Sequence, residues 1–187
     1  MITQIKTSSE ELKIWKLGFR FFGSNVYLIQ LKEKNILVDV SSYENREELI
    51  TGLEKLNLKP SDIDILLLTH NHWDHVQNID LFLNSNPSIE IYGSKEDFND
   101  ERYSKIKNIK QIESRFPELK IIKTSGHTPG SVCFYLEKEK ILFSGDTIFY
   151  NGIGRTDFPE SSPEEMEKSL EDLRQIPYKK LCPGHSI

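Results

Sequence analysis

Cysteine is scarce in this chain of 187 residues, which contains only Cys133 and Cys182. Both lie in apolar, strand-like segments, which favours buried free thiols over a disulfide or a metal site built on sulfur. Long apolar runs are absent as well, and residues 1–22 mix charged residues with short apolar pairs. The sequence therefore predicts neither a membrane segment nor a secretory signal, and we expect a cytoplasmic protein without a membrane partner.

An excess of positive charge is also absent. The chain has 24 Lys and Arg residues against 29 Asp and Glu residues, a formal net charge of −5, and no long basic run. Proteins that bind nucleic acids neutralise phosphate groups with clustered Lys and Arg side chains. The charge balance argues against a nucleic-acid partner, and we expect a small-molecule substrate instead.

Histidine is rare too, but all five histidines fall in three short segments. A single segment of this kind is most simply a solvated loop or turn, and Asp74 alone is most simply a helix N-cap. The occurrence of all three segments in one chain, with no histidine outside them, predicts a metal site. The segments read Thr69-His70-Asn71-His72-Trp73-Asp74-His75, Gly126-His127-Thr128-Pro129-Gly130-Ser131 and Pro183-Gly184-His185.

The first of these segments follows a predicted strand. Residues Ile63 to Leu68 are apolar except for Asp64, and the pattern from Val76 to Leu83 has helical spacing. We therefore expect the first two histidines to point to one side of an extended chain, and the next two ligands to lie at the turn into the helix. Four ligands at one corner suit two neighbouring metal ions better than one. Imidazoles mixed with a carboxylate suit zinc, iron or manganese.

A further carboxylate follows a strand-like run that starts at Lys140 and ends in Gly145-Asp146. Taken alone, Asp146 is most simply a turn residue. Two metal ions that lie close together need a shared anionic ligand to offset their repulsion, and a short, rigidly held aspartate supplies one. The sequence therefore adds Asp146 to the predicted site.

In these segments the sequence resembles the metallo-β-lactamase-fold hydrolases. Within them it is most similar to the glyoxalase II-like branch, which includes the hydroxyacylglutathione hydrolases and the persulfide dioxygenases. The matching residues specify the fold and the metal site more closely than the substrate. They run in the family's order through Thr69 to His75, Gly126 to Ser131, Ser144 to Thr147, Gly152 to Pro159 and Pro183 to His185.

The resemblance implies a set of ligands for two divalent metal ions, zinc first, with iron or manganese as alternatives. Asp74 would also steer the nucleophile or shuttle its proton. The implied ligands are His70, His72 and His127 for the first metal, Asp74, His75 and His185 for the second, and Asp146 for both.

Other residues are expected to surround these ligands. Asp39, at the end of an apolar strand, matches the family's early aspartate and would orient a ligand histidine, although a turn residue is an equally good interpretation. Tyr150, Asn151 and Arg155 are candidate substrate contacts. For Arg155 the sequence favours a buried ion pair with Asp157 or another carboxylate, which would fix the loop, over an anchor for an anionic substrate.

Length and composition fit one compact domain over residues 1–187. The order of predicted elements fits the architecture that the resemblance implies, an αββα sandwich of two mixed β-sheets flanked by helices. A charged stretch from Asp97 to Lys110 is expected to hold a helix and a surface loop. Strands are predicted at residues 12–17, 26–31, 36–40, 63–68, 89–92, 119–123, 132–136 and 141–144, and helices at 46–56, after residue 76, and from Pro163 to Pro177.

The resemblance implies hydrolysis of a thioester, or a related ester, by a metal-bound hydroxide. The larger glyoxalase II enzymes bind glutathione largely through a helical carboxyl-terminal extension, and this chain stops at Ile187. We therefore expect that extension to be absent, so the resemblance implies hydrolysis but not glutathione as the carrier thiol, and another thiol, an ester or a lactone stays open. Two alternatives stay open. One is a persulfide dioxygenase with one iron held by His70, His127 and Asp146, and the other is a non-catalytic metal-binding protein on the same scaffold.

Overall fold

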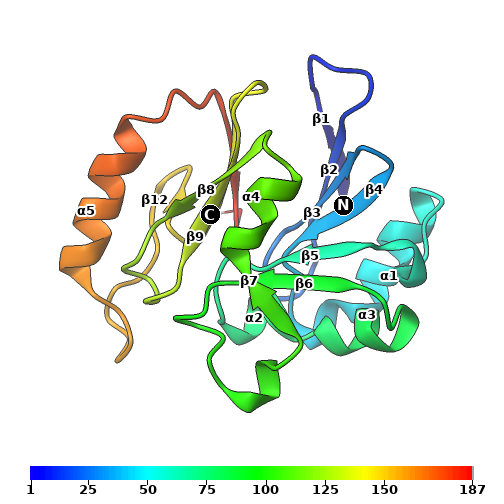
Figure 1. The fold of residues 1–187 in the computed structure, drawn as a ribbon, viewed down its shortest axis with the longest axis horizontal. Coiled ribbons are helices and arrows are strands. Elements are labelled where there is room, and N and C mark those ends of the chain that lie inside the picture. Colours follow the sequence, from blue (N-terminus) through cyan, green and yellow to red (C-terminus); the bar gives the residue numbers. More distant parts are fainter. Residues whose placement is uncertain (187) are drawn as a thin grey trace. The chain divides into compact units, whose positions relative to one another are not determined.

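The computed structural model describes residues 1–186, which divide into two compact units (Figure 1). The first unit comprises Met1–Leu68 and His72–Ile91. The second unit comprises Thr69–Asn71 and the chain from Tyr92 onward. The short segment from Thr69 to Asn71 therefore belongs to a different unit from the residues on either side of it.

The sheet of the first unit is built from strands that pair in the order of the chain. Its strands are β1 (Ile2–Ile5), β2 (Lys13–Leu17), β3 (Val26–Leu31), β4 (Lys34–Val38) and β5 (Ile65–Leu67). Strands β1 to β4 are antiparallel, and β5 runs parallel to β4. Strand β6 (Glu90–Gly93) begins in this unit and ends in the second.

The helices of the first unit are α1 (Arg46–Lys55), α2 (Trp73–Val76) and α3 (Ile79–Ser85), with the 3-10 turns η1 (Tyr43–Asn45) and η2 (Pro60–Asp62). Helix α1 packs closely on strand β2. A Cβ added to Gly52 would lie 2.8 Å from Cδ2 of Leu17, so a larger residue would require the buried Leu17 side chain to shift.

The main sheet of the second unit has the strand order β13-β10-β9-β8. Strand β13 is parallel to β10, and the other neighbours are antiparallel. Every residue of β9 and β10 is buried, which explains their unbroken apolar character. The strands are β8 (Leu119–Lys123), β9 (Val132–Leu136), β10 (Ile141–Gly145) and β13 (Lys180–Pro183).

Helix α5 (Pro163–Arg174) covers one face of this sheet (Figure 1). Its Leu173 belongs to a buried cluster with Cys133, Tyr135 and Leu142 from β9 and β10. The helix begins as the sequence predicts, because the Ser162 side chain accepts a hydrogen bond from the main chain of the third helical residue and a proline occupies the first position. The smaller elements of the unit are η3 (Glu101–Tyr103), β7 (Ile106–Asn108), η4 (Ile109–Gln111), α4 (Ile112–Arg115), β11 (Ile148–Phe149) and β12 (Gly152–Ile153).

Two predicted helices differ from the structure. The stretch from Asp97 to Lys110 holds no α-helix but two 3-10 turns and strand β7, because Asp100 and Asn108 cap those turns with their side chains. The helix predicted after residue 76 is divided into α2 and α3. The buried side chain of Asn78 lies at the break and donates hydrogen bonds to the carbonyl groups of Val40 and Ser42.

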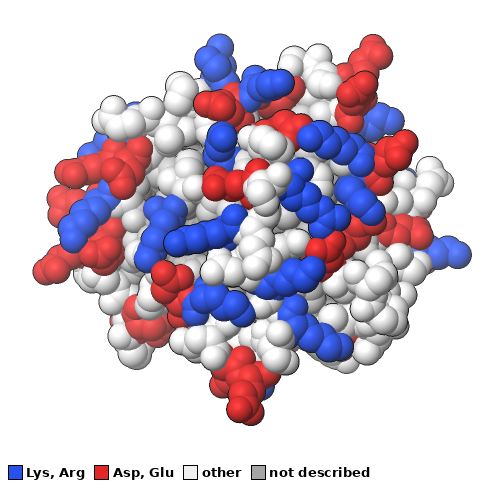
Figure 2. Space-filling model, viewed as in Figure 1, with Lys and Arg blue, Asp and Glu red and all other residues white. Residues whose placement is uncertain are grey.

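The surface of the protein carries both signs of charge. On the face that Figure 2 shows, Lys and Arg side chains are interspersed with Asp and Glu side chains. None of the helices within residues 1–186 combines the length and the apolar character that crossing a bilayer requires.

Cys133 and Cys182 are buried free thiols, as the sequence predicts. Burial raises the pKa of the Cys133 thiol to about 11, because a thiolate would lose its hydration in the core. Hydrogen bonds with Thr124 and Thr147 offset only part of this rise. The native state therefore holds the thiol proton more tightly than the unfolded chain does.

This shift predicts a loss of stability at alkaline pH. The contribution of Cys133 is complete below the ordinary thiol pKa of 9.0 and is lost as the pH rises toward 11. We expect the free energy of unfolding of the wild type to fall over this range by about 2–3 kcal/mol more than that of Cys133→Ala. Urea unfolding at a series of pH values measures the difference. If the free energy of unfolding depended on pH equally in the two proteins, the raised pKa of Cys133 would be contradicted.

Candidate metal centre

Four of the seven predicted ligands lie in the second unit, at one edge of its main sheet. His127 lies in the loop between β8 and β9, Asp146 directly follows β10, and His185 follows β13. The strand pairings bring these three positions to the same edge, because β10 and β13 are parallel and β9 runs against β10. The fourth ligand, His70, belongs to the same unit through the segment Thr69–Asn71, whose first carbonyl accepts a hydrogen bond from the main chain of β9.

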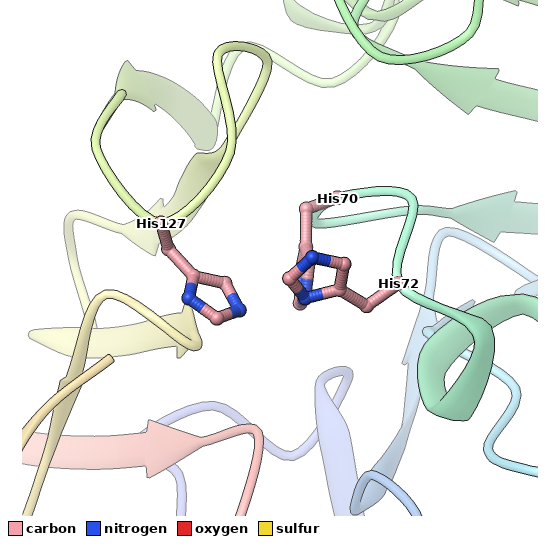
Figure 3. A group of neighbouring side chains, drawn as sticks. All are labelled: His70, His72 and His127. Carbon is pink, nitrogen blue, oxygen red and sulfur yellow. The ribbon is translucent and has the colours of Figure 1, made fainter. Parts of the chain in front are cut away.

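The four side chains converge on one carboxylate. The Nε2 atoms of His185 and His127 lie 3.3 and 3.6 Å from Oδ2 of Asp146. The rings of His70 and His127 meet edge to face with centroids 4.9 Å apart (Figure 3). One ligand atom of His70 lies within 4.8 Å of one from His127, and one lies within 4.8 Å of a carboxylate oxygen of Asp146. These separations are those of atoms that can surround a common cation.

Hydrogen bonds orient the imidazole of His127. Its Nδ1 donates to the main-chain oxygen of Arg155 at 2.8 Å. A carbonyl oxygen only accepts, so the proton of the neutral ring is on Nδ1 and the lone pair is on Nε2, the atom that faces Asp146. The Nδ1 of His70 similarly lies 3.0 Å from Oγ1 of Thr69. Metal-binding histidines commonly use one ring nitrogen for such a contact and the other for the metal.

The first unit holds the other three predicted ligands together with Asp39. The carboxylate of Asp39 accepts a hydrogen bond from Nδ1 of His75 at 2.8 Å, and both side chains are buried. The main chain is fixed as well, because the amide of Val40 donates to the carbonyl of His75. The Nε2 atom of His75 therefore points away from Asp39, just as Nε2 of His127 points away from the main-chain oxygen of Arg155.

The local structure around these ligands differs in one respect from the sequence prediction. Asp74 and His75 lie inside the short helix α2 rather than at a turn that precedes the helix. His72 is the N-cap residue of α2 and extends from the loop that carries His70 two residues earlier (Figure 3). The amide of Ser24 donates to the carbonyl of Asp74, which ties α2 to the loop between β2 and β3.

The donor set suits a divalent metal ion. Neutral imidazoles with a carboxylate are the ligands of zinc and iron sites, and the partly exposed Asp146 lies among the buried rings of His70 and His127. The residues therefore fit the metal chemistry that the sequence predicts.

Known proteins share this sequence pattern. Residues 19–185 match the family described as the metallo-beta-lactamase superfamily. The chain belongs to this superfamily. Among its relatives, the probable metallo-hydrolase MJ0888 of Methanocaldococcus jannaschii is 32% identical to this chain, with 92% of each chain covered. The hydroxyacylglutathione hydrolase GloC of Haemophilus influenzae is 32% identical, with 80% of this chain and 78% of that protein covered.

Other relatives are longer than the region that matches. A hydroxyacylglutathione hydrolase of Buchnera aphidicola is 33% identical over 83% of this chain, but the match spans only 59% of that protein. Among solved structures, TTHA1623 in a di-iron-bound form superimposes with a TM-score of 0.76 at 24% identity, with 92% of each chain covered. This likeness shows that the superfamily member has the metallo-β-lactamase α/β sandwich fold that the sequence predicts.

The loop after Asp146 includes the three predicted substrate contacts. Arg155 pairs with Asp157 through two hydrogen bonds of 2.8 Å, and its guanidinium lies 4.3 Å from the ring centroid of Phe158. The predicted partner is right, but the predicted burial is wrong, because both charged side chains are 66% exposed. The Arg155 side chain thus stabilises the loop surface, whereas its main-chain oxygen is the group that contacts a histidine.

Tyr150 and Asn151 are both exposed. The Tyr150 hydroxyl donates to the carbonyl of Leu181, the second residue of β13, two residues before the start of the Pro183-Gly184-His185 segment. Asn151 lies in the turn between β11 and β12. A contact of either residue with substrate stays a prediction.

Asp97 is a functional candidate that sequence reasoning missed. Its carboxylate accepts hydrogen bonds from the main chain of Asn71, from the hydroxyl of Thr128 at 2.6 Å and from the main chain of Gly130 at 2.7 Å. It therefore links the residue after His70 to the loop that carries His127. A Cβ on Gly130 would lie 2.6 Å from this carboxylate, so the glycine permits the close approach. No local pattern marks Asp97, because its partners are distant in sequence.

We expect Asp97→Ala to weaken metal binding about 10- to 100-fold, because the two histidine loops of the second unit would lose their common acceptor. Competition with a chelator measures the affinity. Asp100→Ala is the matched control, since that aspartate lies three residues away, caps an exposed turn and pairs with Arg102 at the surface. Equal metal affinity in both variants and the wild type would show that Asp97 does not position the histidines.

Proposed function

We propose that this protein is a metal-dependent hydrolase that cleaves a thioester, or a related ester, at a dinuclear metal centre. The observation that carries the proposal is the orientation of two imidazoles. His75 and His127 each donate from Nδ1 to a fixed oxygen, which places the lone pair of each neutral ring on Nε2, the atom through which a metal ion would be bound. Membership of a superfamily that includes hydroxyacylglutathione hydrolases supports the same conclusion.

The proposed ligands follow the sequence pattern of the family. Zinc is the proposed metal, and iron or manganese would suit the same donors. The proposed sets are His70, His72 and His127 for one ion, Asp74, His75 and His185 for the other, and Asp146 for both.

Two divalent ions held there would make a hydroxide available near neutral pH and polarise the carbonyl group of the substrate. The protein contributes the rest. The carboxylate of Asp146 would offset part of the positive charge of such ions, and that of Asp39 keeps the ring of His75 in one orientation. Asp74 is the proposed group that steers the nucleophile and accepts its proton.

The proposed substrate class is small-molecule thioesters. Two of the relatives described above are named hydroxyacylglutathione hydrolases, and their names describe the cleavage of a thioester. For this chain we propose the bond that is cleaved and not the thiol that carries the acyl group.

The test is a hydrolysis assay with zinc-loaded protein under anaerobic conditions. We expect thioesters of N-acetylcysteamine to be cleaved without oxygen, with a rate that rises with pH until the bound water has ionised. His75→Ala should reduce zinc occupancy from two ions to one per chain. A wild-type protein that is saturated by one zinc ion, or that carries two and cleaves no thioester or ester, would contradict the proposal.

One observation favours a second candidate, an iron-dependent persulfide dioxygenase. His70, His127 and Asp146 all lie in the second unit, and they form a set of two histidines and one carboxylate. This enzyme would require iron(II), consume oxygen with glutathione persulfide and lose activity when zinc replaces iron, because zinc has no redox chemistry. Oxygen uptake by the iron-loaded protein, without thioester cleavage by the zinc form, would select this candidate.

A further inference from the structure

Two aromatic side chains of the first unit touch each other at the surface. Phe22 is 67% exposed and Trp73 is 50% exposed. Their ring centroids lie 5.8 Å apart with an angle of 39° between the ring planes. Large apolar side chains that are exposed and adjacent commonly mark a binding site. We call this pair the aromatic platform.

Buried polar groups hold the backbone beneath the platform. Oγ of Ser42 donates to the carbonyl of Phe22 at 2.6 Å, and Nδ2 of Asn45 donates to the carbonyl of Phe21 at 3.2 Å. The next residue, Gly23, has no room for a side chain, because an added Cβ would lie 2.6 Å from Asn45 Nδ2. The loop therefore displays its aromatic rings from a fixed backbone, and little conformational entropy would be lost when a ligand binds.

The platform adjoins the predicted metal ligands of the same unit. Trp73 lies between His72 and Asp74 in the sequence and begins helix α2. The other half of the platform is tied to the same helix, because the amide of Ser24 donates to the carbonyl of Asp74 at 2.8 Å. A ligand that lies on these rings is therefore next to the residues that we propose hold a metal ion.

The size and charge of the platform indicate its ligand. Its two partly exposed rings offer roughly 250 Å², estimated from aromatic side chains that bury 150–250 Å² each. A stable protein interface buries about 800 Å² on each partner. The only charged residue of the loop between β2 and β3, Arg20, pairs with Glu48 at 2.5 Å, so its charge is already balanced. A single uncharged apolar group fits this surface better than a protein or an anion.

We infer that the aromatic platform binds an apolar acyl or aryl group next to the scissile carbonyl, so that the preferred substrates carry a bulky apolar acyl chain. This inference rests on the proposed hydrolase function and defines its substrate class. Trp73 and Phe22 act as specificity-determining residues, since they contact the acyl chain and not the reacting bond.

The first experiment measures binding to metal-free protein and does not depend on hydrolysis. The chain has two tryptophans, so Trp15→Phe leaves Trp73 as the only indole. We expect its fluorescence to change saturably with 4-phenylbutyrate at a concentration at least tenfold lower than with acetate. Adding Phe22→Ala should raise the 4-phenylbutyrate concentration for half-saturation about tenfold. Tyr43→Ala is the matched control, because that exposed ring lies under the Arg46 guanidinium and outside the platform.

The second experiment compares two thioesters of N-acetylcysteamine with the zinc-loaded enzyme. We expect kcat/KM for the 4-phenylbutyryl thioester to exceed that for the acetyl thioester at least tenfold in the wild type. The ratio should fall toward one in Phe22→Ala and Trp73→Ala, and Trp73→Phe should restore most of it. The control Tyr43→Ala should keep the ratio of the wild type.

The two experiments distinguish the proposed thioester hydrolysis from the binding of an apolar acyl group by the aromatic platform. If neither thioester is cleaved but fluorescence shows selective binding of 4-phenylbutyrate, the proposed hydrolysis fails and the apolar binding site stands. If both thioesters are cleaved with equal kcat/KM and the fluorescence does not saturate, the hydrolase stands and this inference is overturned. Dimer formation or binding to phosphatidylcholine vesicles that Phe22→Ala abolishes, without acyl selectivity, would assign the platform to another occupant and also overturn it.

Discussion

Asp146→Asn is expected to lower kcat/KM for the proposed thioester hydrolysis by at least about 10³-fold, because the carboxylate is the anionic group on which the histidines of the second unit converge. Arg155→Ala is expected to lower it less than about tenfold. The Arg155 side chain pairs with Asp157 at the surface, and the main-chain oxygen that orients His127 is retained in the alanine variant.

The measurement combines steady-state kinetics with metal analysis of both variants. Asp146→Asn should also bind less zinc, because an amide oxygen carries no net charge to offset the cations of the proposed centre. The assignment would be reversed if Arg155→Ala were the more damaging substitution while its metal content and stability matched those of the wild type.

Gly154→Ala is expected to destabilise the protein by at least about 3 kcal/mol and to remove metal binding. A Cβ on Gly154 would lie 1.8 Å from the main-chain oxygen of Asp146 and 3.2 Å from Nδ1 of His127. Neither the Asp146 oxygen nor the His127 nitrogen can move away from the new Cβ without displacing a predicted ligand. The loop would therefore have to shift, and it would carry the carboxylate and the imidazole out of position.

Gly152→Ala is the matched control for this substitution. It lies two residues away, at the start of strand β12, and a Cβ there would meet no atom within 4 Å. We expect its free energy of unfolding to stay within about 0.5 kcal/mol of the wild type. Urea unfolding and zinc titration of both variants test the pair. Similar stability and zinc affinity in Gly154→Ala and Gly152→Ala would contradict the close packing around Asp146.

The strands that the sequence predicts most accurately are those with a strong local pattern. Strands β3, β8 and β9 begin and end at the predicted residues. Strand β1 was missed because only its two end residues are partly buried, so it has no apolar run. Strand β7 was missed because it is three residues long, and pairing rather than side-chain pattern makes it a strand.

The chemistry of the candidate site could be predicted from residue type. Imidazoles grouped in short segments and aspartates at strand ends are visible without a structure, and so is the capping serine of α5. The resemblance implied that Asp39 orients a ligand histidine, and its hydrogen bond with His75 confirms this, but the sequence did not indicate which histidine. The contact of His127 with the main chain of Arg155 was not predicted, because it joins residues 28 positions apart and no local pattern encodes it.

The sequence by itself determined the superfamily, the residue types available to a metal ion and the strands with continuous apolar character, because each of these is a property of a short segment. Only the tertiary structure decided which nitrogen of each oriented histidine carries the lone pair, that Asp97 links two loops and that the Arg155 ion pair is exposed. These features depend on contacts between distant segments, which form only when the strands pair and bring their ends to one edge of a sheet.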